Sequence, residues 1–132
     1  MAYAVGFGLA VLTVILARLV GFDRDRVFYT TLVIIVAHYY VLFAVMGGST
    51  RALVVESIVM TAFVAIAVIG FKFNVWLIVA ALAGHGIFDF VHGYLVTNPG
   101  VPPWWPAFCL AFDVTAAAAL AWFLLRRSRD TA

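Results

Sequence analysis

Residues 84–93, GHGIFDFVHG, place three ionisable side chains inside a long apolar run. On a helix, positions i, i+4 and i+7 share one face, so His85, Asp89 and His92 form a polar stripe about two turns long. The flanking sequence is too hydrophobic for the surface helix of a soluble protein. The stretch therefore predicts a membrane helix with one polar face, and that face needs partners inside the protein.

The composition is that of an integral membrane protein. Of the 132 residues, 67% are hydrophobic and only 11% are charged, and the mean hydropathy is +1.15. Ordinary globular domains are far less apolar. The net charge of +2 comes from arginines in loops and near the terminus, which gives no ground for a nucleic-acid partner. We expect a multi-pass protein surrounded by membrane lipids, in a prokaryotic inner membrane or a plasma membrane.

Five apolar segments predict an all-α fold, a compact bundle of five transmembrane helices that forms one domain over residues 1–132. Charged or turn-forming stretches separate them, including the proline-rich residues 97–106. The first segment has no basic flank and no suitable cleavage site, and we expect it to be retained. The predicted spans are residues 4–20, 27–46, 52–71, 74–96 and 107–125.

The basic residues predict the orientation of the bundle. Five spans put the two termini on opposite sides, so the loops and ends fall into two groups. On one side the only basic residue is Arg51. The positive-inside rule therefore makes the other side, which carries the remaining basic residues, cytoplasmic. The N-terminus is therefore expected outside and the C-terminus in the cytoplasm. The cytoplasmic group consists of Arg18, Arg24, Arg26, Lys72, Arg126, Arg127 and Arg129.

Six ionisable side chains occupy similar depths in the last four spans. Counting 1.5 Å per residue from the outer span ends places them within roughly 6 to 17 Å of the outer interface. A carboxylate at such depth costs on the order of 2.5 to 3.5 kcal/mol, so it must be protonated, paired or bound to a cation. No lysine or arginine lies in this layer. The six residues are His38, Glu56, His85, Asp89, His92 and Asp113.

These residue types match the donors of a divalent metal site. Imidazoles and carboxylates suit zinc, iron or manganese, with copper less favoured, and Cys109, one turn before Asp113, could add a sulfur. The spacing of Asp89 and His92 repeats that of ligands in di-iron and di-manganese bundles. Glu56, nearest the outer surface, is the candidate general base. The predicted metal ligands are His38, His85, Asp89, His92 and Asp113.

A set of histidines and an aspartate inside a helical bundle resembles the intramembrane zinc hydrolases, such as the adiponectin receptors and the alkaline ceramidases. Those proteins have seven spans and a different order of ligands, so no residue role is transferred from them. The leading hypothesis is a metal-dependent enzyme, a hydrolase or an oxidase, acting on a lipidic or isoprenoid substrate in the outer half of the membrane. The loop of residues 97–106 could cover its site.

Other hypotheses stay open. The polar layer could be a proton or metal-ion pathway or a ligand pocket, although the inner half has few polar residues. His38 with His85 or His92 could hold haem in a subunit of a larger membrane complex. A structural hydrogen-bond network would explain the stripe without any ligand. Two copies could also associate through small residues of the fourth span, which are Ala83, Gly86 and Gly93.

Overall fold

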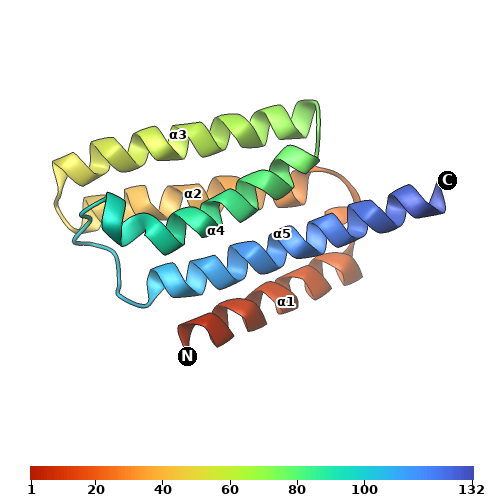
Figure 1. The fold of residues 1–132 in the computed structure, drawn as a ribbon, viewed down its shortest axis with the longest axis horizontal. Coiled ribbons are helices and arrows are strands. Elements are labelled where there is room, and N and C mark those ends of the chain that lie inside the picture. Colours follow the sequence, from red (N-terminus) through yellow and green to blue (C-terminus); the bar gives the residue numbers. More distant parts are fainter.

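The computed structural model describes residues 1–132 and is all-helical (Figure 1). It confirms five helices long and apolar enough to cross a membrane. The last helix continues five residues beyond its predicted end, because arginines are good helix formers and suit a helix C-terminus. The elements are α1 (Ala2–Val20), η1 (Phe22–Arg24), α2 (Val27–Met46), α3 (Thr50–Lys72), α4 (Trp76–Leu95) and α5 (Trp105–Asp130).

The helix ends follow local sequence signals. Gly21 ends α1 in the left-handed region with φ 87°, a conformation that glycine adopts without steric cost. Ser49 caps the start of α3, where its hydroxyl oxygen accepts the Ala52 N–H at 3.1 Å. Asn74 acts in the same way before α4, where its side-chain oxygen accepts the Trp76 N–H at 3.0 Å. These caps fix where the chain reverses between the apolar segments.

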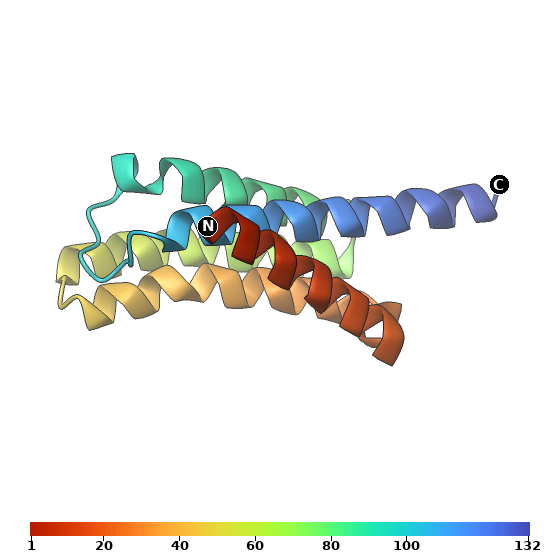
Figure 2. The same ribbon diagram turned by 90° about the horizontal axis from the view of Figure 1, so that it is seen from below.

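Successive helices run in opposite directions, which gives the bundle two distinct ends (Figure 1). The N-terminus, the α2–α3 turn and the α4–α5 loop gather at one end, here called the N-terminal end. The α1–α2 connection, the α3–α4 turn and the C-terminus lie at the other, the C-terminal end. Helix α5 packs against both α4 and α1, and α3 packs against α2 and α4. Figure 2 shows α1 crossing α5 at an angle.

The interior of the bundle changes character along its length. The part nearer the C-terminal end is an apolar core built from α2, α3, α4 and α5. The buried ionisable residues lie in the other part, toward the N-terminal end, and form the site described below. The buried ionisable residues therefore adjoin an apolar core on their C-terminal side. The main core residues are Tyr29, Val33, Ala67, Ile78, Ala81, Leu82, Ala116, Ala117 and Leu120.

Helix α1 depends on Gly6 for its contact with α5. A Cβ atom at Gly6 would lie 2.2 Å from the Phe108 carbonyl oxygen, so the two backbones touch directly. We expect Gly6→Ala to push α1 away and lower the free energy of unfolding by about 1 to 3 kcal/mol. Gly8→Ala is the matched control, because a Cβ there meets nothing within 4 Å. Equal thermal unfolding of the two variants in detergent would contradict this close packing.

Candidate metal centre

His85 on α4 lies between two aspartates. Its Nδ1 is 2.6 Å from Oδ2 of Asp113 on α5 and 3.5 Å from Oδ2 of Asp89, one turn along α4. The Cys109 thiol, one turn before Asp113, lies 3.8 Å from the same Asp113 oxygen. None of the four residues is more than 2% exposed, and one donor atom from each lies within 4.8 Å of the others. This group, called the tetrad below, could hold a metal ion.

The tetrad comes from two helical i, i+4 pairs that face each other. His85 and Asp89 share one face of α4, while Cys109 and Asp113 share one face of α5. Gly86 lets the helices approach, because a Cβ atom there would lie 3.0 Å from the Val114 side chain. Small residues at such contacts allow close helix packing in membranes. The four donors therefore converge as a direct result of sequence spacing and a close α4–α5 contact.

Two buried carboxylate oxygens of the tetrad have no hydrogen-bond donor. These are Oδ2 of Asp89 and Oδ1 of Asp113. His85 is the only basic side chain paired with either aspartate. Buried acceptors are normally satisfied, and an uncompensated buried carboxylate is costly. The site thus has an excess of acceptor oxygens that a cation or additional protons would neutralise.

A second buried pair lies closer to the N-terminal end. His92 Nε2 is 2.6 Å from Oε1 of Glu56, which is 1% exposed. The Asn98 amide, in the α4–α5 loop, donates to the same Glu56 oxygen and to the Tyr40 carbonyl, both at 3.0 Å. Glu56 Oε2 has no partner. The α4–α5 loop thus contacts the buried polar residues nearest the N-terminal end through the side chain of Asn98.

Tyr40 of α2 joins the two groups. Its hydroxyl donates to Oδ1 of Asp89 at 2.6 Å, and its ring stacks on the His92 imidazole with 3.9 Å between centroids and 12° between planes. Phe63 and Phe88 pack edge-on against His85 and His92, at 4.9 Å and 5.3 Å between ring centroids. A polar line therefore runs from the tetrad through Tyr40 to the α4–α5 loop, inside an aromatic shell.

The structure brings together three of the five predicted metal ligands, His85, Asp89 and Asp113, and adds Cys109 to them. His92 is paired with Glu56 instead. His38 is exposed, and its Nδ1 lies 2.6 Å from the Ile34 carbonyl oxygen, so the structure places it outside the tetrad. The role of Glu56 as general base stays a prediction.

Sequence reasoning missed two residues of the polar line. Tyr40 was not among the predicted residues, although it lies two positions after His38, where helical side chains point about 200° apart. Only one of these two side chains could face the interior, and that residue is Tyr40. Asn98 lies beside Pro99 in the α4–α5 loop, and no spacing pattern identifies a loop amide as the partner of a buried carboxylate.

No protein-family model matches this chain, and comparisons with curated proteins and with solved structures give no match. The function is therefore inferred from the site itself.

Proposed function

We propose that this chain is an intramembrane metalloprotein that binds a divalent cation at the tetrad. The observation that carries the proposal is the convergence of four donors within 4.8 Å, with two carboxylate oxygens lacking any hydrogen-bond donor. A bound cation would neutralise the buried negative charge of the two aspartates. One imidazole, two carboxylates and a thiol favour zinc first and iron second, because a sulfur donor disfavours magnesium and calcium.

The proposed activity is metal-dependent hydrolysis of a lipidic substrate that enters between the helices. Three of the four tetrad donors would be enough to hold a catalytic zinc, and the ion would then supply Lewis acidity to a water or substrate in the remaining position. Glu56 is the proposed proton acceptor, since its Oε2 has no hydrogen-bond partner. His92 holds the other Glu56 oxygen, and Tyr40 links the pair to Asp89. The apolar outer faces of the helices favour approach of a substrate from the bilayer.

A second candidate function is passage of protons or cations to the tetrad from the N-terminal end. The polar line from Asp89 through Tyr40 to Asn98 favours it. The apolar core toward the C-terminal end opposes a route through the whole bundle, so such a path would be a half-channel. Haem is less favoured than a metal ion, because His38 is exposed whereas His85 and His92 are each bound to a carboxylate.

The metal proposal is tested on full-length protein purified in mild detergent without chelator, by elemental analysis and absorption spectroscopy. We expect equimolar zinc or iron in the wild type and its loss in His85→Ala, because His85 is the only imidazole of the tetrad. His38→Gln is the matched control and is expected to keep the metal. Metal-free wild type that also fails to bind added zinc would contradict the proposal, as would metal retained in His85→Ala.

The hydrolase part is tested on the metal-loaded samples. Vesicles of ester-linked and amide-linked lipids are supplied, and release of fatty acid is measured. Glu56→Gln is expected to keep the metal and to lower the rate about a hundredfold or more, as removal of a general base does. Exchange of the bound metal with zinc added to one side only of sealed vesicles, without proton uptake and without lipid cleavage, would instead support the half-channel.

A further inference from the structure

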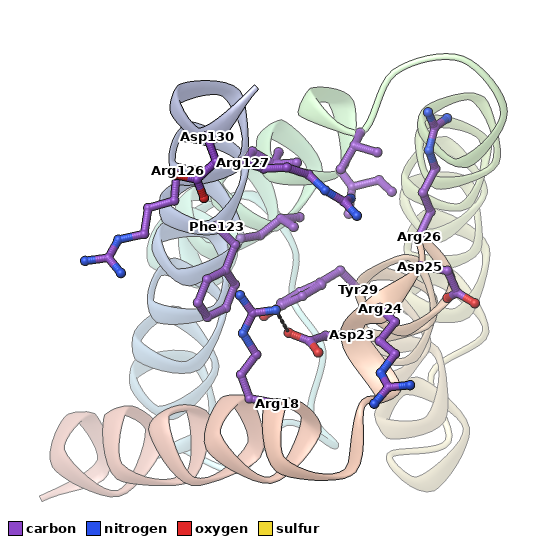
Figure 3. Close-up of a pocket in the computed structure, with 14 residues that line it drawn as sticks. Arg18, Asp23, Arg24, Asp25, Arg26, Tyr29, Phe123, Arg126, Arg127 and Asp130 are labelled. Carbon is purple, nitrogen blue, oxygen red and sulfur yellow. Dashed lines mark hydrogen bonds and ion pairs between the residues drawn. The ribbon is translucent and has the colours of Figure 1, made fainter. Parts of the chain in front are cut away.

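A cavity lies at the C-terminal end of the bundle, away from the tetrad. It measures about 780 Å³ and is bounded by η1 and the adjoining ends of α1, α2, α4 and α5 (Figure 3). Five arginines and three aspartates line it together with apolar side chains such as Ile78 and Leu120. The volume is within the range of small-molecule sites. A cationic rim above an apolar wall is suited to an amphiphile with an anionic head.

Three of the five arginines are engaged within the protein. Arg18 donates to Oδ2 of Asp23 at 3.0 Å. Arg26 donates to the Phe71 carbonyl at 3.0 Å and so closes the end of α3. Arg126 stacks on Trp122, with 4.8 Å from its guanidinium carbon to the ring centroid, and extends away from the cavity in Figure 3. These three guanidinium groups are therefore partly satisfied before any ligand binds.

The other two arginines have no partner in the protein. Arg24 and Arg127 make no side-chain hydrogen bond or ion pair to acidic groups, and Figure 3 shows Arg127 extending from α5 toward the space between the helices. Two of the lining aspartates are already engaged, Asp23 by Arg18 and Asp25 by the Val27 N–H at 2.9 Å. The balance of charge in the cavity therefore favours an anion.

Tyr29 gives an independent indication of a ligand. Its side chain lines the cavity and is 3% exposed, yet its hydroxyl has no hydrogen-bond partner. A buried hydroxyl without a partner costs free energy, and such groups are uncommon in native structures. The unused donor lies among the arginines of the same cavity (Figure 3). An acceptor oxygen of a ligand would satisfy it.

We propose that this cavity binds the phosphate group of an anionic amphiphile. Guanidinium groups match phosphate oxygens in geometry, so Arg127 is the charge partner and the Tyr29 hydroxyl is the second donor, while Arg24, whose side chain lies against Gly21, adds positive charge to the rim. An acyl or isoprenoid chain would lie along Ile78 and Leu120. The expected cytoplasmic position of this end faces the leaflet in which anionic lipids gather. A soluble phosphate compound would use the same donors.

The test titrates full-length protein in a maltoside detergent, which carries no phosphate, and follows binding by native mass spectrometry. Phosphatidic acid is one arm, and inorganic phosphate and glycerol phosphate form the soluble arm. We expect saturable binding of one phosphatidic acid per chain, weakened about tenfold by Arg127→Gln and again by Tyr29→Phe, because each removes one charge-assisted hydrogen bond. Arg129→Gln, on the same end of α5 but outside the cavity, is the control and should bind normally.

The soluble arm identifies the source of the phosphate. If the soluble phosphates fail to compete, the ligand is a lipid, and if they compete with similar affinity, it is a soluble phosphate compound; either result supports the phosphate site. Oleate binding as tightly as phosphatidic acid would overturn the proposal, because a carboxylate would then serve equally well. Unchanged binding by both Arg127→Gln and Tyr29→Phe would overturn it too. Tyr29→Phe is a mild change, because it removes only one oxygen atom and keeps the packed ring.

Discussion

The double variant Asp89→Asn, Asp113→Asn is expected to lose zinc binding and yet, in the presence of a chelator, to be at least as stable as the wild type. In the absence of metal, the two aspartates share His85 as their single basic partner, and two of their oxygens have no hydrogen-bond donor. Neutral amides remove the buried negative charge. They also keep a carbonyl oxygen for the Tyr40 hydroxyl and another for His85, so the bonds that join the helices persist.

Added zinc should reverse the order of stability. Wild type in zinc at about one hundred times its dissociation constant gains about 2.7 kcal/mol, because a ligand that binds only the folded state stabilises it by mass action. The double variant gains nothing, since an amide is a poor ligand for zinc. Thermal unfolding of both proteins, each with chelator and with zinc, measures the four values. His38→Gln is expected to follow the wild type in both conditions.

A hydrogen-bond network without metal predicts a different pattern. Zinc would then leave the wild type unchanged, and the double variant would lose stability in chelator, because a charged acceptor makes stronger hydrogen bonds than an amide. The two hypotheses therefore differ in the sign of the effect under chelator as well as in the response to zinc. The comparison does not require knowledge of the substrate.

The helices, and the gathering of the buried polar residues toward one end of the bundle, could be predicted because both depend on spacing along one chain. Apolar runs of membrane length give the spans, and the i, i+4 spacing of His85 and Asp89 gives a shared face. Direction around a helix could not be predicted in the same way. Helix α2 is apolar on all sides, so nothing in its sequence indicates that Tyr40 faces inward and His38 outward.

The partners across helices were also beyond the sequence. Depth counting places Glu56 and Asp113 at similar heights, but it does not say that α5 lies next to α4 on the tetrad side while α3 lies on the other. That arrangement separates the six ionisable residues into three members of the tetrad, the pair of Glu56 and His92, and the exposed His38. Asn98 depends further on the path of an irregular loop, and loop paths carry little periodic signal.

The path of that loop leads to the second large effect, which is expected for Gly100→Ala. A Cβ atom at Gly100 would lie 1.8 Å from the Phe43 carbonyl oxygen and 2.9 Å from the Gly47 nitrogen, so the α4–α5 loop rests directly on the end of α2. Alanine cannot fit unless the backbone moves. Asn98 lies only two residues before Gly100, so displacement of the loop would withdraw the Asn98 amide from Glu56. We expect thermal unfolding to report a loss of about 3 kcal/mol, from overpacking together with a lost hydrogen bond to a charged group.

Gly93→Ala is the control for this prediction, because a Cβ there meets nothing within 4 Å and alanine is the better helix former. It should be neutral or stabilising by up to about 1 kcal/mol. A double-mutant cycle with Asn98→Ala then isolates the cause. If the loop shift is what breaks the Asn98 bonds, Asn98→Ala adds little in the Gly100→Ala background, whereas independent effects would add. Additive losses would mean that Asn98 stays on Glu56 when the loop moves, and that the polar line is held from within the bundle and not by its loop.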